Sequence, residues 1–154
     1  MTFSHDGLRD SLTHLAAPPY FYENLRRELS IAQRNKSKLS LVRFLLSQYE
    51  LGNLTPKNAS EPSESYYEVA ILSFSEILKA SIRSEDLCAR LGQLEFTLIL
   101  KGSPEIATSL AERVLRSWNF EGFACRYSVL AVDSAESSLE ILNRLDNQEL
   151  HSAT

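Results

Sequence analysis

Arg83 and Asp86 stand three residues apart, so a guanidinium and a carboxylate could act together on one polar ligand. An arginine presents a planar fork of donors, whereas a carboxylate accepts hydrogen bonds from N–H groups. The simpler interpretation is a surface ion pair, with Arg83 favourably placed at the C-terminus of a helix. The chain has 16 Lys and Arg against 20 Asp and Glu, so a polyanion would have to be met by a local group of arginines.

The other reactive side chains form no constellation typical of catalysis. Cys88 and Cys125 stand alone in apolar segments and match no metal spacing, which predicts buried free thiols in a reducing compartment. His5, His14 and His151 lie near the chain ends without an accompanying nucleophile or carboxylate. We therefore expect no metal site, no redox chemistry and no cofactor.

Length and composition predict a single soluble domain over residues 1–154. A chain of 154 residues, 44% of them hydrophobic, can bury a proper core but is too short for two ordinary domains. No apolar run approaches the roughly 18 residues of a membrane span, and the N-terminus has no basic region followed by an apolar one. We expect a cytoplasmic protein with no membrane or nucleic-acid partner.

Four stretches carry apolar residues at helical spacing behind a proline or a capping residue, which predicts four helices. The first helix covers residues 18–35, and the second runs from a capping box at Ser65 and Glu68 to about Ile82. The third is capped by Ser103 and carries Ile106, Leu110, Val114 and Trp118 on one side. The last begins with a capping box at Ser137 and Glu140. Trp118, Tyr66 and Tyr67 are expected in the core or at an interface.

Four strands are predicted between these helices. Residues 38–46 have apolar side chains at both odd and even positions, which is typical of a central strand covered on both faces. Residues 86–91 and 94–101 flank Gly92-Gln93, a connection that favours a tight hairpin, and residues 123–132 form the last strand. Residues 47–64 are rich in Gly, Asn, Pro and Ser and predict a long loop beside the central strand.

The predicted order is helix, strand, helix, strand, strand, helix, strand, helix. The middle six elements form the split βαβ arrangement, in which right-handed crossovers put both helices on one face of an antiparallel sheet. The sequence therefore predicts an α+β fold with a ferredoxin-like core and the order α-βαββαβ-α. Fold alone does not give function, because this core hosts many activities.

The segment from Arg83 to Phe96 resembles diguanylate cyclase (GGDEF) domains, which have Arg-x-x-Asp, five residues, and then Gly-Gly-Asp/Glu-Glu-Phe. Further matches follow in order at Asp10-Ser11-Leu12-Thr13, Lys38-Leu39-Ser40-Leu41, Ala111-Glu112-Arg113 and Ile141-Leu142-Asn143-Arg144-Leu145-Asp146. The resemblance implies a nucleotidyl cyclase core over about residues 20–150, in agreement with the fold predicted independently.

The family's metal positions are changed in this chain. Its members place a metal-binding Asp at the end of the first core strand and an acidic residue at the third letter of the hairpin motif, and these positions fall on Leu45 and Leu94. Leucines cannot hold magnesium, which demands oxygen ligands. The resemblance therefore implies a degenerate domain that does not cyclise GTP and is not an enzyme.

The family's inhibitory site, where cyclic di-GMP binds as a product, is retained. Its Arg, Asp and distal helix Arg match Arg83, Asp86 and Arg113, and Arg90 is added to the expected ligand set. A guanidinium can fork onto guanine O6 and N7, while a carboxylate accepts from the N1 and N2 hydrogens. Arg113 could stack on the base or neutralise a phosphate.

Asn53, Glu68 and Glu95 are the remnants of the nucleotide site that the resemblance implies. Asn53 aligns with a guanine-contacting Asn, Glu68 with its acidic partner beyond an enlarged loop, and Glu95 survives from the hairpin motif. The simpler interpretations are that Asn53 forms a turn and that Glu95 is a charge at a hairpin edge.

Three functions stay open. The first is a cyclic di-GMP receptor that signals by association with an unidentified protein partner or with a second copy of itself. The alternative is a ligand-independent interaction module, a pseudo-enzyme that docks a partner through its sheet edge or through the former catalytic groove, where Leu45 and Leu94 would form an apolar patch. The third is binding of GTP without turnover through Asn53, Glu68 and Glu95.

Overall fold

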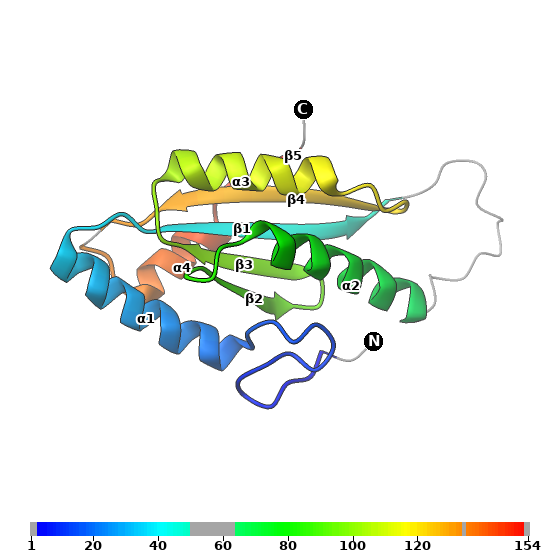
Figure 1. Cartoon of the computed structure of the whole chain (residues 1–154), viewed down its shortest axis with the longest axis horizontal. Helices are drawn as coiled ribbons and strands as arrows, with labels where there is room; N and C mark the ends of the chain where they lie inside the picture. Colours follow the sequence, from blue (N-terminus) through cyan, green and yellow to red (C-terminus); the bar gives the residue numbers. More distant parts are fainter. Residues whose placement is uncertain (1–2, 50–63, 134, 153–154) are drawn as a thin grey trace.

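The chain folds around one antiparallel sheet with helices on both of its faces (Figure 1). The computed structural model describes residues 3–49, 64–133 and 135–152. Its elements are α1 (Pro18–Asn35), β1 (Ser40–Gln48), α2 (Glu64–Ser81), β2 (Leu87–Gly92), β3 (Glu95–Leu100), α3 (Pro104–Ser117), β4 (Phe123–Ala131), α4 (Ser138–Asp146) and β5 (His151–Ser152). The predicted α+β class is confirmed.

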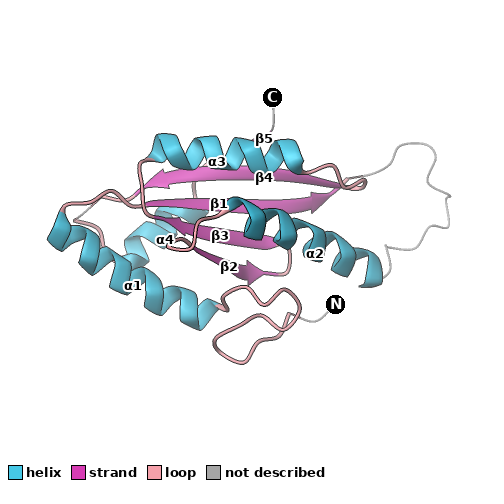
Figure 2. Ribbon diagram, in the orientation of Figure 1, coloured by secondary structure: helices cyan, strands magenta, loops and turns pink. Residues whose placement is uncertain are grey.

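The strands lie in the order β2-β3-β1-β4-β5, and every neighbouring pair is antiparallel (Figure 2). β1 is central, with Phe44 opposite Phe96 of β3 and Tyr127 of β4. The first four strands, α2 and α3 form the predicted ferredoxin-like core. β5 was not predicted, because a two-residue strand is too short to show an alternating pattern.

Each face of the sheet has its own apolar core. Val42, Phe44 and Leu46 of β1 belong to the cluster under α2 and α3, whereas Leu41 belongs to the cluster under α1 and α4. Successive side chains of a strand point to opposite faces, so a strand covered on both faces needs apolar residues at consecutive positions. This explains the unbroken apolar run and confirms the predicted central strand.

The predicted starts of three helices agree with the structure. α1 begins at Pro18, Ser103 accepts the Ile106 backbone N–H at the start of α3, and Ser137 and Glu140 form the predicted capping box at the start of α4. The helix predicted from Ser65 to about Ile82 is confirmed as α2, but the predicted cap at Ser65 was wrong, because the helix already includes Glu64 and Ser65 lies inside its first turn. An acidic residue is favourable there, next to the positive end of the helix dipole.

The hairpin turn lies one residue later than predicted. Gly92 pairs with Glu95, so Gln93 and Leu94 make the connection and Gly92 ends β2. The register shifts between Arg90 and Gly92, and this irregularity keeps the glycine in the strand. The described glycines with positive φ are Gly7 and Gly122, so Gly92 does not serve as a left-handed turn residue.

The cysteines and the large aromatic residues are structural. Cys88 and Cys125 are buried free thiols, as predicted, and burial raises the pKa of each to about 12. Trp118, Tyr66 and Tyr67 pack against the core under α2 and α3, in agreement with their expected role. In the part of the chain that the structure describes, no helix has both the length and the apolar character needed to cross a membrane.

Candidate functional site

Arg83 and Asp86 lie between α2 and β2 and are bonded to each other. Asp86 Oδ2 accepts the backbone N–H and the Nε–H of Arg83, both at 3.3 Å, and Oδ1 accepts the backbone N–H of Lys101 at 3.2 Å. The Asp86 side chain is 0% exposed, so these donors replace the water that a buried carboxylate loses. Asp86 therefore ties this turn to the end of β3 and holds Arg83 in position.

Arg83 and Arg113 line one groove between the end of α2 and the face of α3. Arg83 donates Nη2–H to the Lys101 carbonyl at 3.0 Å, and Arg113 donates Nη2–H to the Ser81 carbonyl at 3.3 Å. The groove has a volume of about 410 Å³, and we call it the arginine groove; its lining includes Ser81, Arg83, Glu105, Ile106, Ser109 and Arg113. Two of the expected ligand residues thus meet, although they are far apart in the sequence.

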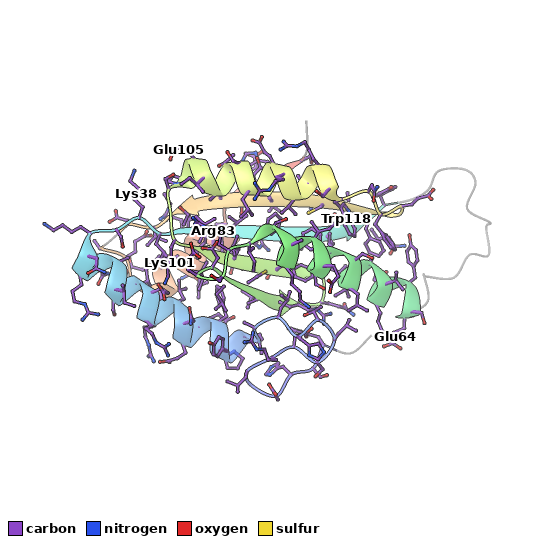
Figure 3. The ribbon with its side chains drawn as sticks, viewed as in Figure 1. Lys38, Glu64, Arg83, Lys101, Glu105 and Trp118 are labelled. Carbon is purple, nitrogen blue, oxygen red and sulfur yellow. The ribbon has the colours of Figure 1, made fainter. Side chains whose placement is uncertain are left out.

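Two residues of the arginine groove were missed from the sequence. Ile106 was expected on the apolar side of α3, but it is 50% exposed, and its neighbour Glu105 is also exposed. Both stand in the first turn of α3, at the end of the molecule where Figure 3 also shows Arg83, Lys38 and Lys101. Apolar spacing predicted the helix correctly, but it could not tell that the first turn faces a groove and not the core.

The expected ligand role of Arg90 is contradicted by its burial. Its side chain is 0% exposed, and Nη1 lies 3.0 Å from Asp10 Oδ1, whose side chain is also 0% exposed. Nε and Nη2 donate to the Gln93 carbonyl, and the Phe3 ring lies 4.9 Å from the guanidinium carbon. Arg90 therefore anchors the N-terminal segment to the hairpin and does not reach the arginine groove.

This anchor involves one of the motifs quoted from the sequence. Asp10 Oδ2 also accepts the backbone N–H and the hydroxyl of Thr13, at 2.8 and 2.7 Å. Ala16 then pairs with β2, since it donates to the Cys88 carbonyl and accepts from the Arg90 N–H. Burial lowers the pKa of the Arg90 guanidinium, and the nearby Asp10 carboxylate opposes this effect. The segment before α1 thus covers the outer edge of β2.

Leu45 and Leu94 lie on opposite sides of the sheet. Leu94 packs against the core under α2 and α3, whereas Leu45 alternates with Phe44 and Leu46 and therefore faces the other side. Because the two partly exposed side chains lie on opposite faces of the sheet, the expected common apolar patch does not form. Hydrocarbon side chains also offer no oxygen donor, so these two positions do not fit a magnesium ion.

Of the three residues expected at a nucleotide site, Glu95 and Glu68 are described, and they interact with different arginines. Glu95 is bound by Arg43 of β1, with Oε1 at 2.9 Å from Nε and 2.5 Å from Nη2. Glu68 lies on α2, where its charge acts on the buried Arg90. Asn53 and most of the predicted loop lie outside the described residues. Within the part of the chain that the structure describes, no group of three His, Cys, Asp or Glu side chains could hold a metal ion.

Two larger grooves are present, and one of them shares Glu105 with the arginine groove. One of about 690 Å³ separates the end of α1 from the start of α3 and includes Lys36 and Lys38, and one of about 500 Å³ runs between α3 and β4 and includes Tyr127 and His151. Neither contains Arg83 or any other residue that the sequence singled out for binding. The arginine groove is smaller but is lined by two arginines from different elements, so it is the better candidate for an anionic ligand.

Comparison with known proteins finds similarity both to a curated sequence and to solved structures. No family model matches the chain. It is 28% identical over 138 residues to the diguanylate cyclase DgcS of Shewanella oneidensis, a match that covers 87% of this chain. The same match covers 45% of DgcS, so the chain spans less than half the length of this curated relative.

Solved GGDEF domains have the same fold. The GGDEF domain of DgcB from Caulobacter crescentus, solved in complex with c-di-GMP, superposes with a TM-score of 0.77 at 18% identity, covering 94% of this chain and 89% of that one. The diguanylate cyclase SiaD of Pseudomonas aeruginosa, solved with its activator SiaC, gives 0.71 at 22% identity, covering 90% and 55%. The chain therefore has the fold of a GGDEF domain and a sequence similar to that of a diguanylate cyclase.

Proposed function

We propose that this chain is a catalytically inactive GGDEF-type domain that binds cyclic di-GMP in the arginine groove and passes the bound state to a partner protein. The observation that carries the proposal is that Arg83 and Arg113 line one groove of about 410 Å³. Local clustering of arginines is what a chain with a net charge of −4 needs in order to hold an anion.

The two guanidinium groups have suitable donors for this ligand. The contacts of Arg83 with described residues engage Nε and Nη2, and those of Arg113 engage Nη2. An arginine has five N–H donors, so each can also fork onto guanine O6 and N7 or onto a phosphate. Because Asp86 and two backbone carbonyls already hold these side chains, less conformational entropy is lost when a ligand binds.

The size of the groove supports signalling by association. Its volume lies at the low end of the range of about 300–1,000 Å³ that is usual for small-molecule sites. A groove of this size would hold part of a cyclic dinucleotide and leave the rest at the surface. A second protein could contact that exposed part, so ligand and partner would bind cooperatively.

The catalytic inactivity in this proposal rests on the donor chemistry of the former active site. Leu45 and Leu94 provide no metal ligand, and Arg43 neutralises Glu95. Incubation with GTP and magnesium should therefore give no cyclic di-GMP in a chromatographic assay. Accumulation of product at a rate proportional to enzyme concentration would refute this part of the proposal.

Calorimetric titration with cyclic di-GMP tests the receptor function. Wild-type protein should bind, and Arg83→Ala and Arg113→Ala should each weaken binding by about tenfold or more, the loss expected for a charge-assisted contact. Arg116→Ala is the matched control, because Arg116 is exposed on the same helix but does not line the arginine groove. No heat at tens of micromolar ligand, roughly the weakest useful affinity for a regulator, would refute the proposal.

The outer edge of β4 favours a second candidate function, ligand-independent docking of a protein partner. Among the described residues, β5 pairs with Arg126 and Tyr127 of the nine-residue β4. The side chains of Trp118, Gln148 and Arg144 donate to the Phe123, Val129 and Ala131 carbonyls, so this edge is open to another chain mainly around Cys125. An edge strand with unpaired backbone groups can add a strand from another chain. A partner retained equally well with and without cyclic di-GMP, and equally by Arg83→Ala, would favour this function over the first.

A further inference from the structure

Asp86 does not face the arginine groove. Both of its oxygens accept hydrogen bonds from Arg83 or Lys101, its side chain is 0% exposed, and it is absent from the groove lining. A ligand could reach this buried carboxylate only by displacing the bonds that hold Arg83 and the Lys101 backbone in place. In this fold Asp86 is a positioning residue that holds Arg83.

Glu105 is the carboxylate that lines the arginine groove, at the border with the larger groove that includes Lys36 and Lys38. It lies in the first turn of α3, whose start is set by the Ser103 cap and by Pro104, so its backbone position is well defined. Figure 3 shows Arg83 and Glu105 at the same end of the molecule. Within the described part of the chain, no Arg or Lys nitrogen lies within 4.0 Å of the Glu105 carboxylate, so a ligand group could lie between it and the arginines.

A carboxylate in a groove lined by arginines indicates a ligand that offers donors as well as acceptors. A phosphate alone would be repelled by Glu105, whereas guanine presents O6 and N7 as acceptors and N1–H and N2–H as donors. Adenine presents an acceptor at N1, which would face the carboxylate unfavourably. The combination of arginines and a glutamate therefore suits guanine in particular.

We propose that Glu105, and not Asp86, accepts the N1 and N2 hydrogens of the bound base and so selects guanine over adenine. This assignment rests on the proposed function, since it names the specificity residue of the same groove. The rival explanation is that Glu105 only stabilises the positive end of the α3 dipole. That explanation predicts a change in stability but none in ligand preference.

Calorimetric titration of the full chain with cyclic di-GMP and with cyclic di-AMP separates these explanations. In Glu105→Gln the amide accepts one hydrogen bond and presents N–H groups to the other donor, so cyclic di-GMP should bind about tenfold more weakly. The same amide can pair with adenine, so cyclic di-AMP should bind no more weakly than to wild type. The preference for guanine should therefore fall by about tenfold or more.

Two variants complete the test. Glu112→Gln is the matched control, an exposed glutamate two turns later on α3 and outside the arginine groove, and it should leave both affinities unchanged. Asp86→Asn should weaken both dinucleotides by a similar factor, because it loosens Arg83 without changing the groups that read the base. Thermal unfolding without ligand should show that each variant is folded at the temperature of the titration.

The outcomes distinguish the two levels of the proposal. Wild-type protein that binds neither dinucleotide overturns the proposed function and this assignment with it. Wild-type protein that binds cyclic di-GMP, with a guanine preference unchanged in Glu105→Gln, overturns the assignment alone. A loss of guanine preference in Asp86→Asn and not in Glu105→Gln would return the reading role to Asp86.

Discussion

Arg43 and Glu95 are joined across β1 and β3 by two contacts to one carboxylate oxygen, from Nε at 2.9 Å and from Nη2 at 2.5 Å. Their side chains are 16% and 26% exposed, so solvent screens the pair only partly. Glu95 comes from the hairpin motif that resembles GGDEF, and Arg43 stands two residues before Leu45 on β1. The acidic residue of this motif is thus neutralised by an arginine of the same sheet.

A double-mutant cycle on Arg43→Ala and Glu95→Ala should reveal a coupling energy of about 1 kcal/mol, because the two side chains lose one shared interaction. The measurement is urea unfolding of the wild type, both single variants and the double variant. The exposed pair Arg26 and Glu23, with side chains 70% and 57% exposed, should give a coupling near zero. Additive effects at Arg43 and Glu95 would contradict the prediction.

Asp10→Asn should destabilise the fold by about 3–5 kcal/mol, because it leaves the buried Arg90 guanidinium without its counter-charge. The free energy of unfolding from urea titration measures this loss. Glu76→Gln serves as the control, since its pair with Lys79 is 3.6 Å long with side chains 72% and 38% exposed, and it should change stability by less than about 1 kcal/mol. Equal effects of the two substitutions would be inconsistent with a buried anchor.

Gly122→Ala should destabilise the fold more than Gly7→Ala. Both glycines have positive φ, 95° and 91°, so each alanine suffers backbone strain of about 1 kcal/mol. A Cβ at Gly122 would also clash with the Tyr66 hydroxyl oxygen, whereas a Cβ at Gly7 meets nothing within 4 Å. Thermal unfolding compares the two variants.

Tyr66→Phe tests whether the Tyr66 hydroxyl causes the larger loss of stability expected for Gly122→Ala. The substitution removes the hydroxyl that donates to the Glu121 carbonyl, and it also removes the atom nearest to the new Cβ. Gly122→Ala should therefore cost less in the Tyr66→Phe background than in the wild type. An identical cost in both backgrounds would mean that backbone strain alone is responsible.

Glu136 should contribute to stability in a pH-dependent way. The hydrogen bond from Arg144 holds the pKa of the Glu136 carboxyl below its ordinary value. Because the folded-state pKa is lower than the unfolded-state one, this contribution is present above the unfolded pKa and is lost as the pH falls through the folded-state pKa. The stability difference between the wild type and Glu136→Gln should be largest near about pH 6 and should shrink towards about pH 3.

Urea unfolding across this pH range measures the difference. Glu149→Gln is the control, an exposed glutamate that makes no ion pair with a residue that the structure describes. Its stability difference from the wild type should vary less with pH. A difference between wild type and Glu136→Gln that stays constant down to about pH 3 would contradict the linkage.

Local signals were enough to predict most of the fold. The first-turn prolines, the Ser103 cap and the Ser137–Glu140 capping box act within one helical turn, so they can be read from neighbouring residues. The consecutive apolar positions of β1 likewise reported its burial on both faces. The hairpin turn was predicted one residue too early, because an irregularity of strand register depends on the pairing of β2 with β3 and leaves no local signature.

The candidate site was predicted only in part. Arg83 and Arg113 meet as expected, but Arg90 is buried against Asp10, a residue 80 positions away. Ile106, expected in the core, lies at the arginine groove. Such outcomes depend on which elements pack side by side, and a pattern of apolar and polar residues does not contain that information.

The sequence by itself determined the four helices, the first four strands and their order, because propensity and capping are local properties. Only the tertiary structure decided which carboxylate lines the arginine groove. Asp86 is withdrawn into the protein by the Lys101 N–H, 15 residues away, while the start of α3 presents Glu105 to the arginine groove. The physical reason is that burial and hydrogen bonding, which decide whether a charged side chain can meet a ligand, arise from contacts between distant segments.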